Sequence, residues 1–284
     1  MNGINETVGV ILTEAMKANA PKQGDYMGDD GLLHCGKCHE PRQYRERDWL
    51  GTGVEKLLPV ACACVREERR AFEERMKQEE KRRELDRMRR AGFPDAEMRK
   101  WVFAQDDGAS GKAGDVARRY VDNFPRMMKS GKGLLFCGAV GTGKSFLAAC
   151  IANALIDRGT PCLMTNFMRI VNQLQESFDG RQKYIDGLNR FDLLILDDLA
   201  AERDTDYMLE QVMNVVDSRY RAGLPLIVTT NLSLADFRQA ADVRRERVYS
   251  RLVEMCIPVK VAGADRRGAK AAQGMAELRG LLGL

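Results

Sequence analysis

Eight consecutive residues of the sequence, GAVGTGKS, match the pattern G-x-x-x-x-G-K-[ST]. Glycine has no Cβ, so a glycine-rich backbone can wrap closely around a phosphate chain and offer its N–H groups to the anion. The lysine of such a loop reaches the β- and γ-phosphates, and the final hydroxyl contacts Mg²⁺. The pattern therefore predicts a site for ATP and Mg²⁺. The residues expected to bind them here are Gly138, Gly141, Thr142, Gly143, Lys144 and Ser145.

The segments on either side of this loop have the character that the chemistry requires. Leu134 to Cys137 is an apolar run typical of a buried strand, and the residues after Lys144 have the apolar spacing of a helix. The start of that helix adds its own N-terminal amide groups to the anion site. One further helix, ending at Lys129, is expected before the strand. A glycine-rich turn that occurred by chance would need neither a buried strand before it nor a helix after it. Because both are expected here, we interpret the segment as a phosphate-binding loop.

Two adjacent acids, Asp197 and Asp198, end the apolar run DLLILDD that begins at Asp192. Such a run has the pattern of a buried parallel strand, and ligands of α/β proteins bind at the carboxyl ends of parallel strands. We expect Asp197 to hold Mg²⁺ through water, and Asp198 to orient and deprotonate the attacking water. The alternative is a strand that ends in a turn with two exposed acids.

A polar residue, Asn231, follows the apolar run from Leu224 to Thr229. If this strand neighbours the acidic one, the amide lies beside the two carboxylates, where it can hold the attacking water and sense the γ-phosphate. The local sequence supports a second interpretation equally well, in which Asn231 or Ser233 caps the helix that LADF begins. The catalytic assignment of Asn231 therefore depends on the order of the strands.

Several arginines lie near the C-terminal end, on a predicted helix and beyond the last apolar strand, Ile257 to Val261. In an ATPase that acts as a single subunit they would form only a basic surface. In an assembly, one arginine can reach into the neighbouring site and stabilise the transition state, which raises the rate by ~10³–10⁵. These residues are Arg244, Arg245, Arg247, Arg251, Arg266 and Arg267.

Four cysteines form two close pairs, C-x2-C and C-x-C, with 23 residues between the pairs. Two thiolate pairs at this spacing suit tetrahedral Zn²⁺. The intervening segment has little that could form a core, and structural zinc contributes on the order of 10–16 kcal/mol in small peptides. His34 or His39 could replace one thiolate, and four free thiols are the alternative. The predicted ligands, which leave no position open for catalysis, are Cys35, Cys38, Cys62 and Cys64.

The composition is that of a globular protein, with 284 residues, 44% of them hydrophobic and 30% charged. This length accommodates one large domain and a smaller one. The net charge of +4 does not by itself indicate nucleic-acid binding. No apolar run approaches the ~18 residues that span a bilayer, and the N-terminus has no secretion signal, so we expect a cytoplasmic protein without a membrane partner. Cysteines in that compartment are thiols or metal ligands rather than disulfides.

The remaining elements follow along the chain. Residues 1–20 have the spacing of a short amphipathic helix, and the turn-rich residues 21–31 predict a linker. Val65 to Arg90 has no glycine or proline and several i,i+4 pairs of opposite charge, which predicts a solvated connecting helix rather than a nucleic-acid arm. The expected domains are a metal-binding module over 1–64, a charged linker helix over 65–100 and an ATPase domain over 101–284.

These motifs resemble those of AAA+ ATPases, specifically the DnaC/DnaI-type helicase loaders and the related IstB-like ATP-binding proteins. The matching segments are GKGLLFCGAVGTGKSFLA, FDLLILDDLAAE, VVDSRY, IVTTN, SRL and VAGADRR, within about residues 101–270. The resemblance implies an α/β P-loop fold with a five-stranded parallel sheet flanked by helices and a reduced or missing helical lid. It also implies that Asn231 is the polar sensor, that Arg251 acts in trans as an arginine finger, and that Arg267 or Arg266 is the second sensor. Asp198 departs from the glutamate that AAA+ proteins usually have, and a shorter acid suits slow hydrolysis.

The resemblance further implies an ATP-dependent loader that places a hexameric replicative helicase on single-stranded DNA. The N-terminal module is similar to the zinc-bearing modules through which such loaders grip the helicase, and the AAA+ domains would assemble with ATP in their interfaces. One alternative is an IstB-like ATPase that assists a transposase, against which the zinc module argues. A P-loop kinase would need an arginine-rich lid and act as a monomer, and an adaptor would bind ATP without hydrolysing it. A chromosomal and a phage origin are both open.

Overall fold

The computed structural model describes residues 21–46, 56–108, 110–176, 180–199, 206–238 and 243–266, together with residues 275, 278, 279, 281 and 282. The helix predicted for residues 1–20 lies outside the described residues. The chain divides into two compact units, Met1–Arg82 and Arg83–Leu284, and the division falls within the long helix α2 (Ala63–Gly92). Each unit has its own sheets and its own buried residues.

The first unit contains two small antiparallel sheets. Strand β1 (Tyr26–Met27) pairs with β2 (Leu33–His34), and β3 (Gln43–Glu46) pairs with β4 (Lys56–Pro59). The prediction of a linker over residues 21–31 is wrong, because these residues carry β1 and the turn that leads into β2. Turn-forming residues here close a hairpin rather than separate two domains.

The first unit contains a buried ion pair. The guanidinium of Arg42 donates to the carboxylate of Asp25, and both side chains are almost completely buried. The same carboxylate accepts the backbone N–H of Lys22 at 2.7 Å and of Gly36 at 3.3 Å. A buried charge is stable only when it is paired and hydrogen-bonded, so these contacts fasten the segment before Cys35 to the rest of the unit.

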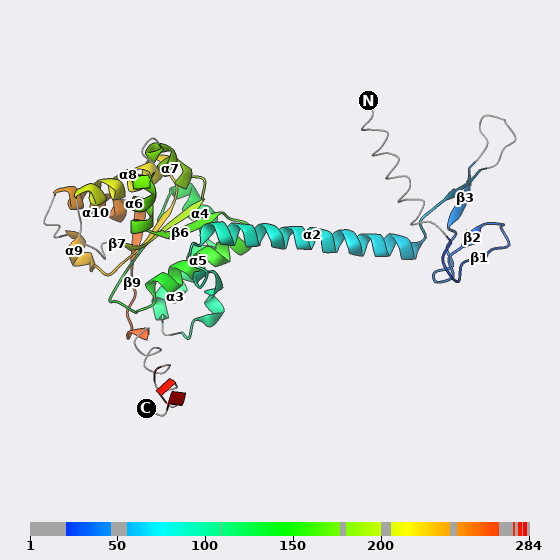
Figure 1. Ribbon diagram of the computed structural model, residues 1–284, viewed down its shortest axis with the longest axis horizontal. Coiled ribbons are helices and arrows are strands. Elements are labelled where there is room, and N and C mark those ends of the chain that lie inside the picture. The colour runs from blue at the N-terminus through cyan, green and yellow to red at the C-terminus, as the bar shows by residue number, and fades with distance from the viewer. Residues whose placement is uncertain are drawn as a thin grey trace. The chain divides into compact units, whose positions relative to one another are not determined.

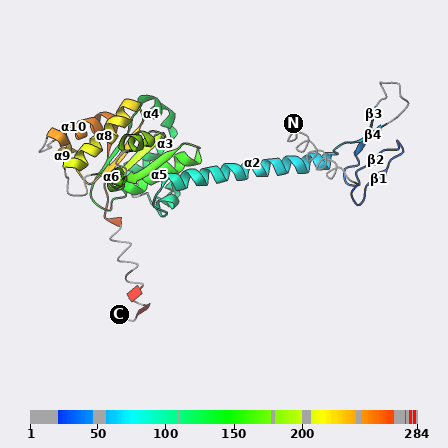
Figure 2. The same cartoon turned by 45° about the horizontal axis from the view of Figure 1, so that its top comes forward.

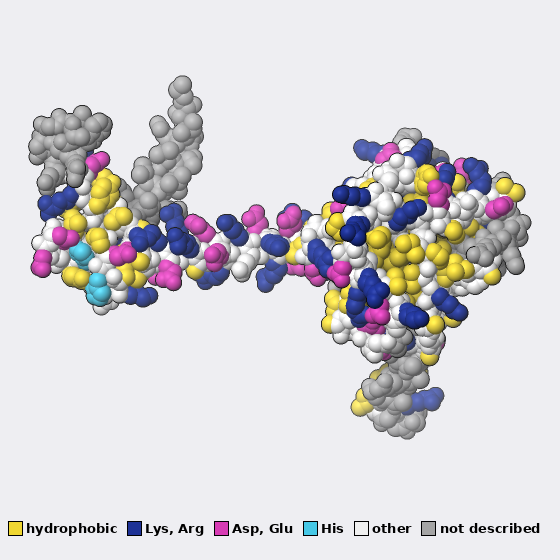
Figure 3. Space-filling model, turned by 180° about the vertical axis from the view of Figure 1, so that it is seen from behind, with side chains coloured by type: hydrophobic (Ala, Val, Ile, Leu, Met, Phe, Trp, Pro, Cys, Tyr) yellow, Lys and Arg dark blue, Asp and Glu magenta, His cyan; other side chains and the backbone are white. Residues whose placement is uncertain are grey.

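Helix α2 is charged along its length, and Figure 3 shows Lys and Arg side chains interspersed with Asp and Glu along it. Arg69 and Glu73, one turn apart, form an ion pair at 3.5 Å. The helix ends at Gly92, where an added Cβ would lie 2.3 Å from the carbonyl oxygen of Cys162. The next residue, Phe93, is fully buried in the second unit. Among the described residues no helix, α2 included, has an apolar stretch long enough to cross a membrane.

The second unit is built on a five-stranded sheet in which all neighbouring strands are parallel (Figure 1). The strand order is β6-β7-β8-β5-β9, which places β5, the strand before the phosphate loop, between β8 and β9. The predicted α/β fold with a five-stranded parallel sheet is confirmed. The strands are β5 (Gly133–Cys137), β6 (Cys162–Asn166), β7 (Leu193–Leu199), β8 (Leu226–Thr230) and β9 (Cys256–Lys260).

Helices cover both faces of this sheet, as Figure 1 and the turned view of Figure 2 show. Successive residues of a strand point to opposite faces, so Leu134 and Phe136 of β5 enter one core while Leu135 and Cys137 enter the other. Short helices η1 (Met98–Lys100), η2 (Phe103–Gln105) and α9 (Leu234–Arg238) complete the connections. The first core is covered by α3 (Gly111–Asp122), α4 (Phe124–Ser130) and α5 (Lys144–Asp157), and the second by α6 (Phe167–Glu176), α7 (Arg181–Leu188), α8 (Asp206–Ala222) and α10 (Val243–Met255).

The prediction of a single helix ending at Lys129 is wrong, because the structure has two helices there. Helix α3 ends at Asp122, and α4 begins two residues later at Phe124. Pro125 has no backbone N–H, so it cannot donate the hydrogen bond that would continue α3. Proline is tolerated in the first turn of a helix, and Pro125 lies in the first turn of α4.

Arg219 of α8 is completely buried, although arginine is rarely found in a protein interior. Its Nη1 donates to the carbonyl oxygen of Phe191 at 2.7 Å, and Nη2 donates to those of Asp192 at 3.0 Å and Pro225 at 2.6 Å. Burial lowers the pKa of the guanidinium to about 10, so it stays charged at neutral pH. Since these carbonyls lie just before β7 and β8, Arg219 fixes the point at which both strands enter the sheet.

We expect Arg219→Met to lower the free energy of unfolding by about 3 kcal/mol or more, because a buried polar group without a partner costs about 1–3 kcal/mol and several carbonyls would lose their donor. Urea unfolding measures the change. Arg221→Met, on the exposed side of the same helix, is the control and should stay within about 0.5 kcal/mol of the parent protein. An equal loss in both variants would contradict the role assigned to Arg219.

Candidate nucleotide site and four-cysteine cluster

The phosphate loop joins β5 to α5 at the carboxyl edge of the sheet. Gly141 and Gly143 have φ angles of +77° and +98°, which residues with a Cβ rarely adopt. A Cβ on Gly141 would also lie 1.8 Å from Oδ1 of Asp265, so that side chain would have to move to make room for any other residue. The hydroxyl of Thr142 donates to the carbonyl oxygen of Ala139 at 2.9 Å and holds the turn closed.

Lys144 begins α5, and its ammonium group turns into the loop. Its Nζ donates to the carbonyl oxygens of Gly138 at 2.9 Å and Ala139 at 2.7 Å, and to Oδ1 of Asn231 at 2.8 Å. The residue is only 6% exposed, and Ser145 beside it is half-buried. An ammonium group, a helix N-terminus and the N–H groups of a tight loop are the donors that a triphosphate requires, so the residues present fit ATP.

The predicted Mg²⁺ ligand Asp197 and the predicted catalytic acid Asp198 meet Asn231 at the same edge of the sheet. Thr229 of β8 donates its hydroxyl hydrogen to Oδ1 of Asp197 at 2.6 Å and accepts the backbone N–H of Asp198 at 2.9 Å. Nδ2 of Asn231 donates to Oδ1 of Asp198 at 3.2 Å. Because β7, β8 and β5 are adjacent, residues from three separate motifs come together here. The Asp197 carboxylate and the Ser145 hydroxyl are suitable Mg²⁺ ligands beside a phosphate site.

The structure distinguishes the two interpretations of the residues after β8. Ser233 caps α9, because its hydroxyl accepts the backbone N–H of Asp236 at 3.3 Å and Asp236 accepts the backbone N–H of Ser233 at 2.6 Å. Asn231 instead bridges Lys144 and Asp198. The amide therefore belongs to the site and not to the helix cap.

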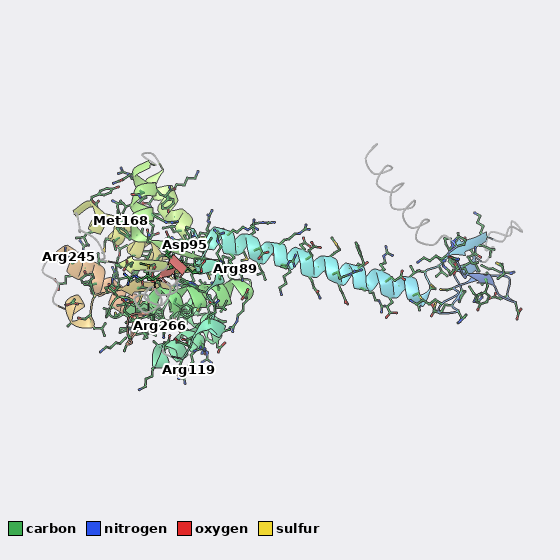
Figure 4. All side chains as sticks on the ribbon, turned by 60° about the horizontal axis from the view of Figure 1, so that its bottom comes forward. Arg89, Asp95, Arg119, Met168, Arg245 and Arg266 are labelled. Carbon is green, nitrogen blue, oxygen red and sulfur yellow. The ribbon has the colours of Figure 1, made fainter. Side chains whose placement is uncertain are left out.

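Arg266, labelled in Figure 4, follows β9. It lies beside the phosphate loop, because a Cβ on Gly143 would be 3.8 Å from its Nη1. Its backbone N–H donates to the carbonyl oxygen of Gly141 at 3.1 Å. Its Nη2 lies 3.2 Å from Oδ1 of Asp107 and 3.4 Å from the hydroxyl of Ser110. Asp107 and Ser110 were not predicted to belong to the site. They lie in the turn before α3, which only the fold brings to the carboxyl edge of the sheet. Arg267, the residue preferred as second sensor, lies outside the described residues.

Arg251 does not join the nucleotide site of its own chain. It lies near the end of α10, which leads into β9 and therefore approaches the amino edge of the sheet, opposite the phosphate loop. Its guanidinium stacks 4.1 Å from the ring centre of Tyr220. Nε donates to Asp217 at 3.3 Å and Nη1 to Glu254 at 3.2 Å. The trans-acting role expected of Arg251 stays a prediction.

The four cysteines predicted as metal ligands come together in the first unit. The Sγ atoms of Cys35, Cys38, Cys62 and Cys64 all lie within 4.8 Å of one another. Backbone N–H groups lower the pKa of Cys38 to about 6, whereas hydrogen bonding to Cys38 raises that of Cys64 to about 12. Thiols this close cannot all ionise unless a cation lies between them, which is the chemistry of a four-thiolate metal site.

The neighbouring histidines have other partners. Nε2 of His34 lies 3.0 Å from Oδ2 of Asp30, and its Nδ1 lies 3.0 Å from the carbonyl oxygen of His39. Nδ1 of His39 lies 3.2 Å from the hydroxyl of Tyr26. The cluster therefore consists of four cysteines, and both histidines support the loop that surrounds it.

A parallel sheet of this order, with a phosphate loop after β5 and acids on β7, defines an AAA+ P-loop ATPase fold. The crystal structure of the DnaC helicase loader superposes with a TM-score of 0.52 and 26% identity, covering 59% of this chain and 100% of that one. A family model described as IstB-like ATP binding protein matches residues 70–273, and the chain belongs to this family.

The relatives of this chain include two replicative helicase loaders. The replicative helicase loader DnaC of Escherichia coli (strain K12) is 28% identical over 140 residues, which cover 48% of this chain and 55% of DnaC. The replicative helicase loader DnaI of Bacillus subtilis (strain 168) is 26% identical over 149 residues, 48% of each chain. The chain thus spans about half the length of these two loaders. The uncharacterized protein YqaM of Bacillus subtilis is 25% identical over 240 residues, covering 80% of this chain and 68% of YqaM.

We expect Lys144→Ala to weaken binding of a fluorescent ATP analogue by about tenfold or more, since a hydrogen bond to a charged group contributes about 1.5–3 kcal/mol. Lys112→Ala, at an exposed position of α3, is the control. Arg251→Ala should bind the analogue like the parent protein, because Arg251 lies at the other edge of the sheet. Fluorescence anisotropy titration measures all three affinities. Unchanged binding by Lys144→Ala, or weakened binding by Arg251→Ala, would contradict this geometry.

Proposed function

We propose that the protein is an ATP-dependent loader of a replicative DNA helicase onto single-stranded DNA during the initiation of replication. The observation that carries this proposal is the combination of an AAA+ nucleotide site with a separate small unit built around four cysteines. An ATPase that delivers another protein needs a part that binds its cargo, and the first unit would supply it. The names of DnaC and DnaI, which describe replicative helicase loaders, support the same function.

The nucleotide site would bind and hydrolyse ATP. Lys144 and the loop N–H groups would hold the phosphates, while Ser145 and Asp197 would hold Mg²⁺. Bound Mg²⁺ neutralises phosphate charge as the γ-phosphoryl group is transferred to water. Asp198 would orient that water and accept its proton, and Asn231 would hold the water and sense the γ-phosphate. We propose slow hydrolysis, stimulated by DNA or by the partner, as suits a switch.

Assembly of several subunits would complete the site. Arg251 would reach the ATP of a neighbouring subunit and stabilise the charge of the transition state. Two contacts of Arg251 favour this role: its guanidinium stacks on the ring of Tyr220, and its Nε donates to Asp217. These contacts fix the orientation of the guanidinium, so it would lose little conformational entropy when it binds a phosphate. Arg266, or Arg267 after it, would be the second sensor from the subunit's own chain.

Single-stranded DNA would bind along the assembled ATPase domains. Contacts of Lys and Arg with phosphates carry no sequence information, so this binding would be non-specific and weakened by salt. Binding without sequence preference suits helicase loading, because the loader would have to bind any single-stranded DNA that is exposed when the duplex opens. The protein would act in the cytoplasm, where the chromosome of a bacterium or its phage is replicated.

We propose that the four cysteines hold a structural Zn²⁺ ion. Zinc prefers tetrahedral thiolate sites, and four protein ligands leave no position for a reacting water. The pKa of Cys38, lowered to about 6, favours the thiolate form that binds metal. The ion would hold together a unit whose buried side chains include the charged pair Arg42 and Asp25.

We expect inductively coupled plasma mass spectrometry to find about one zinc ion per chain in the purified protein. Cys62→Ser should lose most of this zinc and the ordered structure of the first unit, because a three-thiolate site binds more weakly and its folding depends on the ion. Cys150→Ala, which changes a cysteine buried in α5, is the matched control and should keep its zinc. Equal zinc content in both variants would rule out the cluster as the metal site.

The loader function is tested by size-exclusion chromatography with light scattering. The protein is mixed with the hexameric replicative helicase of its host, with and without ATP, and we expect a stable complex. Cys35→Ser/Cys38→Ser should lose the complex, because it disrupts the first unit and leaves the ATPase unit folded. Lys144→Ala should still bind the helicase but fail to transfer it to single-stranded DNA.

The description of the matching family favours a second candidate function. An IstB-like ATPase would assist a DNA transposase, using the same nucleotide site with a different partner. Failure to bind the helicase under every nucleotide condition, together with a complex between the protein and a transposase on DNA, would move the assignment to this candidate. A helicase complex that persists in Cys35→Ser/Cys38→Ser would instead place the partner surface outside the first unit.

A further inference from the structure

A single buried hydroxyl lies between the two acids of the nucleotide site. Thr229 is 1% exposed, and its Oγ1 is 2.6 Å from Oδ1 of Asp197 and 2.9 Å from the backbone nitrogen of Asp198. The directions of these hydrogen bonds are determined by their partners. A backbone N–H can only donate, so the hydroxyl accepts from Asp198 and gives its own hydrogen to the carboxylate of Asp197. The side chain of Thr229 is thus connected to both acids at once.

The pairing of β7 with β8 explains why a side chain is needed here. Leu196 pairs with Val228, but the next pair along the two strands is Leu199 with Thr230. Asp197 and Asp198 therefore occupy a bulge opposite the single residue Thr229. Residues in a bulge lose part of their backbone hydrogen bonding to the neighbouring strand. The hydroxyl of Thr229 takes the place of that backbone acceptor for Asp198.

The bulge also holds Asp198 in an unusual backbone conformation. Its φ is +59°, one of two positive values among non-glycine residues in the described part of the chain. Such a conformation costs on the order of 1–3 kcal/mol and persists only where surrounding contacts enforce it. The bond from Asp198 to Thr229 is such a contact, and it turns the carboxylate toward the amide of Asn231, 3.2 Å away.

We propose that Thr229 is a positioning residue of the ATPase site. Its hydroxyl would aim the carboxylate of Asp197 at Mg²⁺ and would hold the bulge that presents Asp198 to the attacking water. This inference rests on the proposed ATP hydrolysis, and it adds a residue that would act through Asp197 and Asp198. Partners that orient metal-binding groups typically change metal affinity or activity by about 10–100-fold when they are removed.

Three variants of the full-length protein test this role. Thr229→Val keeps the shape of the side chain and removes the hydroxyl, whereas Thr229→Ser keeps the hydroxyl and removes the methyl group. Thr230→Val is the matched control, because Thr230 is buried on the same strand but its hydroxyl donates to the carbonyl oxygen of Leu199 at 2.9 Å. Circular dichroism and thermal unfolding first establish that all three variants are folded.

Two properties are then measured: the Mg²⁺ concentration that half-maximally supports binding of a fluorescent ATP analogue, and kcat and KM for ATP hydrolysis. For Thr229→Val we expect the Mg²⁺ midpoint to rise by about 10–100-fold. We also expect kcat to stay low at saturating Mg²⁺ while KM for ATP changes little, because Asp198 is displaced but Lys144 is not. Thr229→Ser should restore both properties, and Thr230→Val should keep the Mg²⁺ midpoint of the parent protein.

Three results would overturn the inference. Thr229→Val could have the Mg²⁺ midpoint and kcat of the parent protein, or Thr229→Ser could be as impaired as Thr229→Val, which would assign the effect to packing of the methyl group. Thr230→Val could also raise the midpoint equally, which would show general damage to the strand. A parent protein that binds the analogue but never hydrolyses ATP would refute the proposed hydrolysis, and the Mg²⁺ midpoints would still decide whether Thr229 orients Asp197.

Discussion

The hydrogen bonds of the Lys144 ammonium are the contacts on which the nucleotide site depends. A buried cation is stable only when acceptors surround it, and here two carbonyls of its own loop and the amide of Asn231 do so. Asn231 comes from the end of β8, so this arrangement needs β8 beside β5, as the strand order provides. Through Asn231 the same network reaches Asp198 on β7. The charge of Lys144 thereby connects the carboxyl ends of β5, β8 and β7.

The sequence alone predicted the parts of the site that depend on local pattern. The residues from Gly138 to Ser145, the pair of acids after an apolar run, and the two cysteine pairs each have a spacing that the chemistry itself imposes. The five-stranded parallel sheet was implied by the resemblance to AAA+ ATPases, and the structure confirms it. The roles assigned to Asp198, Arg251 and Arg267 remain predictions, since a fold places side chains without showing what they do.

The features that escaped prediction all depend on contacts between distant residues. Thr229 has the sequence character of an ordinary strand residue, and only the bulge opposite it reveals its position between the acids. Arg219 lies in a charged segment typical of a solvated helix face, yet it is buried because carbonyls before two strands need a donor. The turn-rich residues around Asp25 suggested a linker because their partner, Arg42, is distant in sequence. In each case a polar side chain forms a hydrogen bond or an ion pair with a group that only the folded chain brings near it.

The cysteines of the described chain fall into two chemical classes. Burial raises the pKa of the four thiols in the second unit, to about 11 for Cys137, to about 12 for Cys150 and Cys256, and upward for Cys162. The thiolate is the form that alkylating reagents attack, so the raised pKa values slow the reaction of these four thiols in the folded protein. Within the cluster the thiols differ, because the pKa of Cys38 is lowered to about 6 while that of Cys64 is raised to about 12 and burial raises that of Cys62. Cys38 is therefore the thiol that an alkylating reagent attacks first. If the cluster binds Zn²⁺ as proposed, the ion would shield the thiolate of Cys38, and alkylation of Cys38 would then report the loss of metal as a chelator removes it.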